Sequence, residues 1–152
     1  MITAWRLVKK KYADAVLSGE GSSKNPGRWN SFGVPLVCAC SNPSLAVLEV
    51  RVHAGSEAEG LTYALFKIEI PKALVTAIDE SKLPPDWKSN PPPVSTQIIG
   101  SKWARSNGSA VLIVPSVLVP EDFNFLFNPL HPDFHKIRVK SNQDFYLDSR
   151  LW

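Results

Sequence analysis

Two residues of this chain combine a reactive side-chain type with a setting that suits ligand chemistry. Arg28 lies in the stretch 27–30, which reads Gly-Arg-Trp-Asn. A guanidinium is a planar fork that matches two phosphate oxygens, and the glycine beside it lets a ligand approach the backbone. Glu49 follows the helix-like run 43–48 and shares its apolar face, where an unpaired carboxylate is costly to bury. Together they predict a site for a ligand that carries phosphate and develops positive charge during reaction, because a carboxylate can hydrogen-bond a ribose hydroxyl and stabilise an oxocarbenium-like transition state.

Both residues also have structural interpretations, which the pattern leaves open. Arg28 can be a surface arginine that packs on Trp29. Glu49 can be a helix residue that pairs with a buried arginine such as Arg6 or Arg28. The two interpretations of Glu49 are compatible, since an Arg–Glu pair can itself build a site.

Ser116 is a third candidate, because it follows the buried run 110–114 and ligand-binding residues often lie on loops that a rigid element positions. No Gly-x-Ser-x-Gly elbow surrounds it, which argues against a hydrolase nucleophile. The alternative is a turn serine that bonds to the backbone. His131 and His135 lie four positions apart, but Pro132 argues against the helix that would align them for zinc, so we expect no metal site.

The hydrophobic patterns predict the elements that hold these residues. Strands are expected at 4–8, 36–39, 61–70, 74–78, 110–114, 123–127, 134–139 and 144–147. Helices are expected at 43–54, capped by Ser41 or Asn42 with Pro43 in its first turn, and at 94–105. The inward residues of the two helices are predicted to be Leu45, Leu48, Glu49 and Val52, and Val94, Ile98, Ile99 and Trp103. One or two helical turns are expected at 12–17, and long loops at 18–35 and 81–93. A loop as long as 18–35 in a compact domain is usually functional or disordered.

The expected strands and helices make one α+β domain, mixed and strand-rich, over residues 1–152. A chain of 152 residues with 44% hydrophobic and 20% charged residues can bury one core. Its net charge of +3 is compatible with an anionic small molecule or an acidic partner and too weak to indicate nucleic acid. There is no signal-peptide pattern and no apolar run of the roughly 18 residues that a membrane span needs. Cys38 and Cys40 would lie on one face of a strand, where a disulfide between them is geometrically poor, so we interpret them as buried thiols of a cytoplasmic protein.

Several short motifs, in order, resemble the RES domain. The first are Gly-Arg-Trp-Asn-Ser-x-Gly-x-Pro at 27–35 and Ser-Leu-Ala-x-Leu-Glu-Val at 44–50, with His53 after it. Next come Gln-x-x-Gly-x-x-Trp at 97–103 and Val-Pro-Ser at 114–116. Asn-Pro-x-His-Pro-Asp-Phe at 128–134 and Asp-x-Arg-Leu at 148–151 complete the series. Each motif is a modest match by itself, but their occurrence in the family's order over about residues 6–151 makes the resemblance specific.

The resemblance implies a fold, an activity and a partner. The family is named after Arg, Glu and Ser, which correspond here to Arg28, Glu49 and Ser116. RES proteins are typically toxins of type II toxin–antitoxin pairs, whose antitoxin has an Xre-like helix-turn-helix part, and their fold resembles ADP-ribosyltransferases of the diphtheria-toxin kind. The implied chemistry is cleavage of NAD+ at the nicotinamide–ribose bond, with water, phosphate or a protein as acceptor.

On this resemblance we expect NAD+ to bind between the 18–35 loop and the 43–54 helix. Arg28 would hold the diphosphate or orient the nicotinamide ribose, with Trp29 and Asn30 as further ligand contacts. Glu49 would bond the ribose 2′-hydroxyl and stabilise the charge that develops as nicotinamide leaves. Ser116 would bond the ribose or orient Arg28 or Glu49.

One position departs from the family pattern. Ten residues after the motif arginine, where the family often has tyrosine, this chain has Cys38, which cannot stack on a ligand or donate in the same way. This leaves open a second kind of function, a non-catalytic module that binds NAD+ or a partner through the same site. A protein ADP-ribosyltransferase is the other alternative, and direct DNA binding is disfavoured because no basic face or recognition helix is visible.

Overall fold

A computed structural model describes residues 1–152, apart from the side chains of residues 57 and 58. Its seven strands are β1 (Ile2–Lys9), β2 (Val37–Cys40), β3 (Thr62–Ile70), β4 (Val75–Ala77), β5 (Val111–Pro115), β6 (Phe123–Phe127) and β7 (Arg138–Tyr146). The α-helices are α1 (Glu20–Lys24), α2 (Pro43–Ala54) and α3 (Val94–Ser106). Short 3₁₀ turns are η1 (Lys10–Ala15), η2 (Gly55–Ala58), η3 (Lys72–Leu74), η4 (Glu80–Lys82), η5 (Phe134–Lys136) and η6 (Ser149–Leu151). The predicted α+β, strand-rich class is confirmed.

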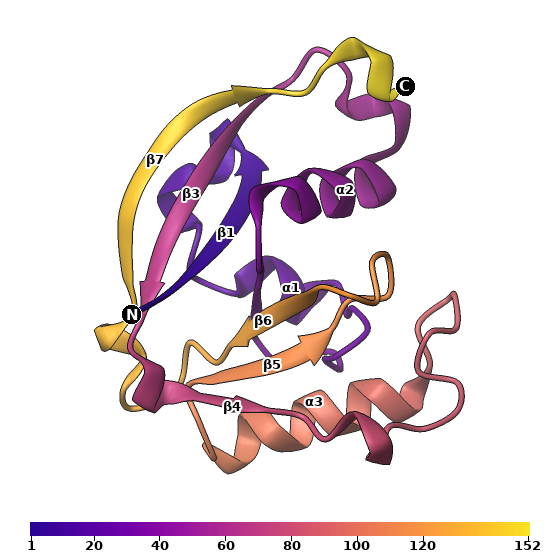
Figure 1. Ribbon diagram of the computed structural model, residues 1–152, viewed down its shortest axis with the longest axis vertical. Coiled ribbons are helices and arrows are strands. Elements are labelled where there is room, and N and C mark those ends of the chain that lie inside the picture. The colour runs from indigo at the N-terminus through magenta and orange to yellow at the C-terminus, as the bar shows by residue number, and fades with distance from the viewer.

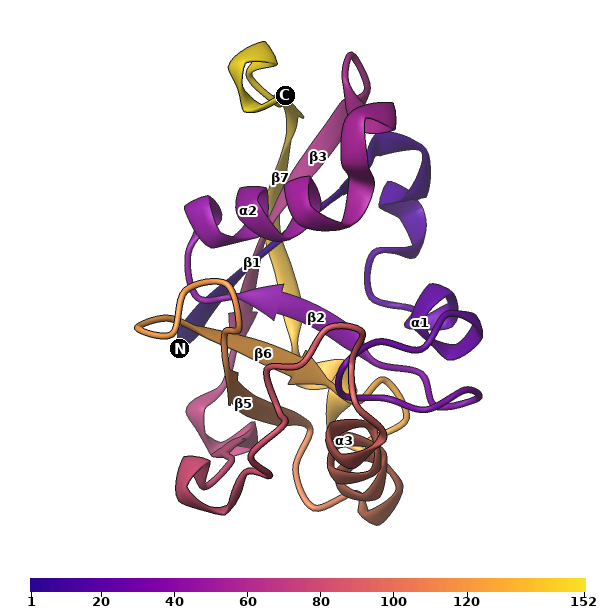
Figure 2. The same cartoon turned by 90° about the vertical axis from the view of Figure 1, so that its right-hand side faces the viewer.

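The strands form one sheet in the order β4-β5-β6-β2-β1-β3-β7, antiparallel except for the β4–β5 pair. The sheet divides at its middle, because β1 and β2 share a single register pair, Trp5 with Cys40. Figure 1 shows the consequence: β1, β3 and β7 rise along one side of the molecule, whereas β4, β5 and β6 run across below them. In Figure 2, β2 continues the lower half beside β6.

Helices cover the two halves differently. Helix α2 packs beside the upper half in a cluster that includes Leu45, Ala46 and Tyr63. Helix α3 lies under the lower half, where Trp29, Leu112 and Leu126 belong to a second cluster (Figures 1 and 2). A third cluster, with Phe125 and Phe127 among its largest members, fills the space between the halves. The two helices are thus held by separate parts of the core.

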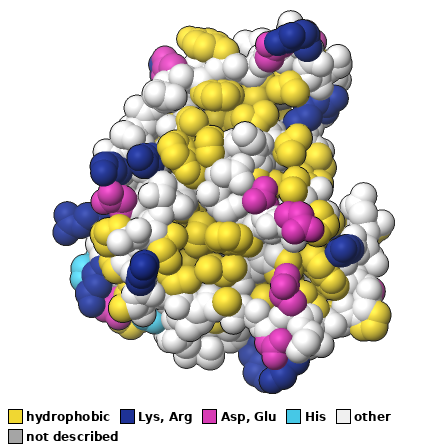
Figure 3. All heavy atoms as spheres, in the orientation of Figure 1, with side chains coloured by type: hydrophobic (Ala, Val, Ile, Leu, Met, Phe, Trp, Pro, Cys, Tyr) yellow, Lys and Arg dark blue, Asp and Glu magenta, His cyan; other side chains and the backbone are white. Residues whose placement is uncertain are grey.

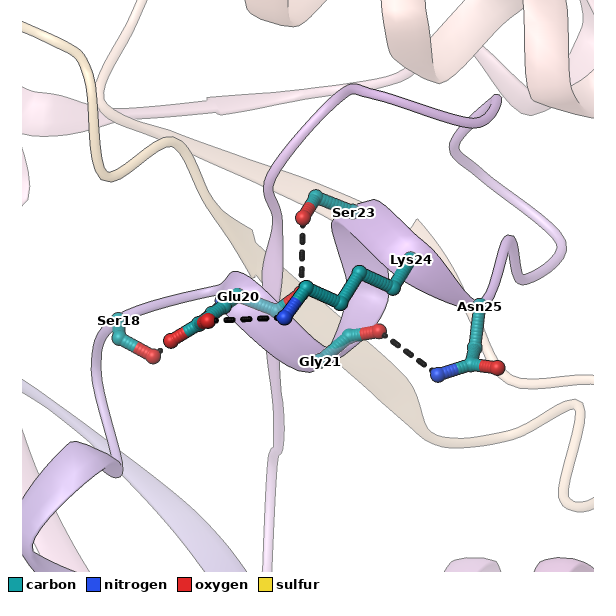
Figure 4. Close-up of polar contacts among 6 residues, drawn as sticks. All are labelled: Ser18, Glu20, Gly21, Ser23, Lys24 and Asn25. Carbon is teal, nitrogen blue, oxygen red and sulfur yellow. Dashed lines mark hydrogen bonds and ion pairs between the residues drawn. The ribbon is translucent and has the colours of Figure 1, made fainter.

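The 18–35 segment is not the continuous loop that the sequence suggested, because it contains α1. Gly19 precedes this helix in the left-handed conformation, with φ 69°, and an added Cβ there would lie 3.1–3.2 Å from Pro129, Pro35 and Leu36. Figure 4 shows the contacts within the turn, including Lys24 Nζ to Glu20 Oε1 at 3.0 Å and Asn25 Nδ2 to the Gly21 carbonyl at 3.2 Å. Local side-chain hydrogen bonds therefore stabilise a helix too short for a periodic hydrophobic signal.

Most predicted elements agree with the structure to within one or two residues, but the C-terminal third does not. The predicted strand 134–139 is wrong, since Phe134–Lys136 forms η5 and the strand begins at Arg138. The run 144–147 is not a separate strand but the end of β7, an exposed edge strand paired with β3. Edge strands carry polar residues on both faces, which hides the hydrophobic alternation that a sequence search relies on.

The surface exposure of the described residues can be compared with expectation for the charged side chains, the two cysteines and the helices. On the face shown in Figure 3, hydrophobic side chains cover much of the middle, and Lys and Arg lie mainly around its margin. Cys40 is buried as expected, but Cys38 is exposed, so its assignment as a buried thiol is wrong. Among the described helices, none has the length and apolar content that crossing a bilayer requires.

Candidate active site

Arg28 is anchored by backbone carbonyls from a distant segment. Its Nη1 atom donates to the carbonyl oxygens of Trp87 and Ser89, at 2.7 and 2.8 Å. Both carbonyls belong to the segment between η4 and α3, which the sequence presented only as a loop. Partial burial lowers the pKa of Arg28, and the nearby negative charge of Glu49 opposes that shift. The guanidinium stays protonated at any physiological pH, and the two carbonyls occupy only its Nη1 group.

The backbone next to Arg28 rests directly on α3. Gly100 is buried in the middle of that helix, and a Cβ built on it would lie only 1.7 Å from the carbonyl oxygen of Trp29. No side chain fits there unless the backbone moves. A glycine inside a helix costs about 1 kcal/mol relative to alanine, so the close approach is its structural reason. Gly100 therefore brings α3 against the residue that follows Arg28.

Two polar contacts clasp this stretch on either side of that approach. Gln97 Nε2 donates to the Gly27 carbonyl at 3.0 Å, and Ser31 N donates to Ser101 Oγ at 2.9 Å. The spacing of Gln97, Gly100 and Ser101 places all three on one side of α3. The family-like motif at 97–103 is thus the surface that shapes the Arg28 loop.

Trp29 and Asn30, which we expected to contact ligand, are both buried. The Asn30 amide accepts from Gly27 N at 2.9 Å and donates to the carbonyls of Ser22 and Val34, at 2.7 and 3.0 Å. These bonds use both ends of the amide, so we assign Asn30 to holding the loop. Trp29 fills the α3 cluster instead of stacking under Arg28, which removes the simple surface interpretation of that arginine.

Glu49 projects from α2 toward the centre of the sheet. Its Oε1 atom accepts from Asn124 Nδ2 of β6 at 3.1 Å, and its Oε2 atom lies 3.4 Å from His53 Nε2, one turn along the helix. The carboxylate side chain is 22% exposed and the His53 side chain is 77% exposed. Hydrogen bonding to Glu49 raises the pKa of His53, while partial burial and repulsion from Arg28 act against it. Neither arginine proposed as a partner forms an ion pair with Glu49 among the described residues.

The helix face that carries Glu49 differs from the predicted one. The Asn42 side chain caps α2 by accepting from Leu45 N at 2.8 Å, as the sequence indicated. Leu45 and Ala46 are buried, but Leu48 and Val52 are 41% and 58% exposed. The prediction of Leu48 and Val52 as core residues is wrong, because the upper half of the sheet meets α2 on the side of Leu45 and Ala46. Glu49 therefore lies at the boundary of the buried face, where its carboxylate stays partly exposed and needs no buried cation.

A similar correction applies to α3. Val94 and Ile98 are 67% and 57% exposed, whereas Ile99 and Trp103 pack inward as predicted. The most buried positions of this helix are small or polar, namely Thr96, Gly100, Ser101 and Ala104. Close approach to the 27–31 backbone requires small residues, and a hydrophobic pattern cannot reveal such a face.

Near Glu49 the sheet is accessible to solvent at Cys38. Cys38 lies in a strand flanked by β1 and β6, yet its side chain is exposed, so solvent reaches this point of the sheet although protein surrounds it. Arg6 braces the backbone beneath it, with Nη1 donating to the Cys38 carbonyl at 2.6 Å and Nε to the Val16 carbonyl at 3.0 Å. Desolvation by the surrounding protein and the negative charge of Glu49 raise the pKa of the Cys38 thiol to about 12. The thiol is thus neutral at physiological pH.

These positions put a fixed cation and a carboxylate in the same neighbourhood without pairing them. The negative charge of Glu49 acts to raise the pKa of both Arg28 and Cys38. The two groups are held by different partners, Arg28 by carbonyls and Glu49 by an amide and an imidazole. A cation and a carboxylate that lie near each other without pairing with each other suit a ligand with an anionic part and a hydroxyl-bearing or cationic part.

Ser116 forms the hydrogen bonds of a local turn, and its predicted role toward the ribose, Arg28 or Glu49 stays a prediction. It is fully buried at the end of β5, where Oγ accepts from Val119 N at 3.1 Å and its own N–H donates to the Asp122 carbonyl at 3.1 Å. This is the turn-serine arrangement that the sequence left as the alternative. The turn leads into β6 and hence to Asn124, the residue that bonds Glu49.

Sequence reasoning missed three features of this site. Asn124 gave no signal because an asparagine inside an apolar strand looks like a defect in the pattern. His53 was noted only as part of a motif, although its spacing of four from Glu49 on a helix already predicts a contact. The Trp87 and Ser89 carbonyls cannot be found from residue types, since every residue has a carbonyl group. Within the described part of the chain, no group of three or more His, Cys, Asp or Glu side chains is arranged to hold a metal ion.

Comparisons with known proteins identify the family. The model of the RES domain matches residues 3–148. A protein of Photorhabdus laumondii named "Toxin Res" is 40% identical over 148 residues, covering 97% of this chain and 95% of its own length. The "Prs ADP-ribosylating toxin" of a Sphingobium strain is 37% identical over 152 residues, with 97% and 94% covered. This chain belongs to the RES domain family.

A solved structure supports the fold independently of close sequence similarity. A chain of the M. tuberculosis MbcT–MbcA toxin–antitoxin complex superimposes with a TM-score of 0.77 at 16% identity. The match covers 95% of this chain and 84% of that one. The α+β arrangement predicted from the family resemblance is thereby confirmed.

Proposed function

We propose that this RES-domain protein is the toxin of a toxin–antitoxin pair and that it cleaves NAD+ at the nicotinamide–ribose bond. Relatives that align with 97% of the chain are named as toxins, and one of them as an ADP-ribosylating toxin. ADP-ribosylation needs an ADP-ribose donor with a reactive bond at the anomeric carbon, which matches NAD+. The observation that carries the proposal is that Arg28 and Glu49 lie within electrostatic range of each other but are held by other partners and form no ion pair with each other among the described residues.

The chemistry assigns a distinct task to each of these two groups. Arg28 would bind the diphosphate or orient the nicotinamide ribose through the N–H groups that its carbonyl partners leave free. The C1′–N bond breaks with its electron pair moving to the pyridinium nitrogen, so nicotinamide leaves uncharged and needs no general acid. Positive charge then develops at C1′, where the Glu49 carboxylate would stabilise it and bond the 2′-hydroxyl. Water or phosphate attacks C1′, and in the case of water the released proton goes to solvent.

The test is nicotinamide release by purified protein. Removing one preorganised charge of this kind costs about 10²–10³ in rate, so Glu49→Gln and Arg28→Ala should each lower turnover by that factor. Glu69→Gln and Arg138→Ala are the matched controls, since Glu69 pairs with Lys140 on the edge strand and Arg138 is exposed there. Turnover by both site variants at the wild-type rate would refute the assignments.

The acceptor distinguishes the proposed reaction from its alternatives. Free ADP-ribose or ADP-ribose 1″-phosphate, measured beside nicotinamide, indicates hydrolysis or phosphorolysis. Transfer of labelled ADP-ribose to protein would instead favour an ADP-ribosyltransferase, the activity that the Sphingobium relative's name states. Calorimetric binding of NAD+ with no nicotinamide produced would select the non-catalytic module. The proposed reaction needs no metal, so release should persist in EDTA.

An antitoxin with an Xre-like helix-turn-helix part is the proposed partner. Leu48 and Val52 form an exposed apolar stripe on α2, next to the turn that carries Glu49 and His53. A partner seated there would cover the carboxylate. Co-expressed antitoxin should restore growth and suppress nicotinamide release, and Leu48→Asp should weaken both effects without lowering the release measured in the absence of antitoxin.

A further inference from the structure

Asn124 is a buried polar residue that neither the family motif nor the sequence pattern accounts for. It lies in β6, between Cys40 of β2 and Val114 of β5 in the register of the sheet. Its side chain is only 7% exposed, in a strand whose other residues 125–127 are all buried hydrophobics. A polar group in such a place needs a specific partner to be retained.

The orientation of its amide identifies that partner. The Nδ2 atom donates to Glu49 Oε1 at 3.1 Å, whereas the Oδ1 atom is buried and accepts no hydrogen bond from the described residues. A carboxylate can only accept, so the NH₂ group must face Glu49, even though this leaves the amide oxygen unsatisfied. The strand therefore buries the Asn124 Oδ1 atom without a hydrogen bond, while the Nδ2 group donates to the Glu49 carboxylate.

The two oxygens of Glu49 consequently have different constraints. Oε1 accepts from a buried amide of the sheet, while among the described side chains the partner of Oε2 is the exposed His53 ring at 3.4 Å. Of the two, Oε2 is the oxygen that a ligand can reach by displacing one solvated contact. The contact at Oε1 thus determines where Oε2 points.

We propose that Asn124 is the positioning residue for Glu49, fixing its carboxylate so that Oε2 faces the ribose of the proposed substrate. The inference rests on the proposed function, which it deepens. An amide suits this task because it orients the carboxylate through a neutral hydrogen bond. A lysine or arginine in its place would orient Glu49 equally well but would offset the negative charge that the developing cation requires.

The decisive variant is Asn124→Asp, which keeps the shape and replaces the donor by a second carboxyl group. Two adjacent carboxyl groups share one proton, because the repulsion between two negative charges raises the second apparent pKa of the pair. Below that pKa the shared proton restores a hydrogen bond to Glu49, and turnover should stay within several-fold of wild type. Above it the two negative charges repel and Glu49 is displaced, so kcat should fall along an alkaline limb that the wild-type profile lacks.

Asn124→Ala removes the donor altogether. Because a misplacement of about 1 Å can cost 10²-fold in rate, we expect kcat to fall about 10- to 100-fold while KM for NAD+ changes little. Asn142→Asp is the matched control, since it makes the same substitution at an exposed position of β7 and should leave the pH profile unchanged. A wild-type kcat for Asn124→Ala, or a pH profile of Asn124→Asp that parallels wild type, would overturn the proposal.

A second measurement does not depend on turnover. The NMR titration of His53 reports on its carboxylate partner, so Asn124→Ala should shift the His53 titration to higher pH as Glu49 turns toward the imidazole. Absence of nicotinamide release by the wild-type protein would refute the proposed function, and the His53 titration would still show whether Asn124 holds Glu49. An unchanged titration in a folded Asn124→Ala protein would count against the positioning role.

Discussion

The Arg28 side and the Glu49 side of the candidate site are held by different kinds of contact. Arg28 sits in a loop that rests on α3 through Gly100, and two backbone carbonyls hold its guanidinium. Glu49 is held by one buried amide and one exposed imidazole, on a helix whose neighbouring residues face solvent. The cationic side therefore depends on backbone packing, and the anionic side depends on two side-chain hydrogen bonds.

This difference indicates how each side can fail. Close packing of the backbone is disturbed when a substitution enlarges a side chain, because protein interiors are dense and tolerate little extra bulk. Side-chain contacts to a carboxylate respond to charge and pH. Substitutions that add volume should therefore damage the Arg28 side, whereas protonation changes should act on the Glu49 side.

Among the substitutions that test this difference, the largest effect on stability is expected from Gly100→Ala. The new Cβ would meet the Trp29 carbonyl, so α3 and the 27–31 loop must separate, and overpacking of this kind costs about 1–3 kcal/mol of unfolding free energy. Nicotinamide release should fall as well, because the loop carries Arg28. Urea unfolding and the release assay measure the two effects.

Gly21→Ala is the matched control for that experiment. Gly21 is also a helical glycine, but a Cβ there meets nothing within 4 Å. Alanine is the better helix former by about 1 kcal/mol, so this variant should be as stable as wild type or slightly more stable. Equal stability of the two variants would mean that α3 does not press on the Arg28 loop.

A smaller, pH-dependent effect is expected from His53→Gln. The pKa of His53 is raised in the folded protein, so its contact with Glu49 stabilises the fold fully below the unfolded-state pKa and ceases to do so as pH rises through the folded-state pKa. Because the ring is mostly exposed, the contribution is that of an ordinary helical pair, about 0.3–0.5 kcal/mol. Urea unfolding should show the variant less stable by this amount at about pH 5.5 and equal to wild type at about pH 9. A difference that persists at alkaline pH would point to packing in place of charge.

The smallest effect is a rate of thiol modification. Although Cys38 is exposed, its pKa of about 12 leaves little thiolate, the reactive species, so alkylation by iodoacetamide at pH 8 should be at least about tenfold slower than for a free cysteine. Glu49→Gln removes one cause of the shift and should speed the reaction modestly, whereas Glu69→Gln should not. Fast alkylation in the wild type would place Glu49 and the surrounding protein farther from the thiol than described.

Much of the fold was predictable from local pattern. Six of the seven strands and both long helices follow runs of apolar residues, and the Asn42 cap and Pro43 define the start of α2. The structure departed from prediction where burial does not follow local pattern. Edge strand β7 lacks an apolar face, α1 depends on local side-chain hydrogen bonds, and the buried face of α3 consists of small residues.

The candidate site divides in the same way. Residue types and motif order by themselves singled out Arg28, Glu49 and Ser116, because those types carry chemistry wherever they lie. Only the tertiary structure decided what each touches: carbonyls 59 and 61 positions away for Arg28, an amide 75 positions away for Glu49, and the local turn for Ser116. Hydrogen bonds between residues far apart in sequence leave no periodic trace in the chain, since they depend on how the two halves of the sheet and their helices come together.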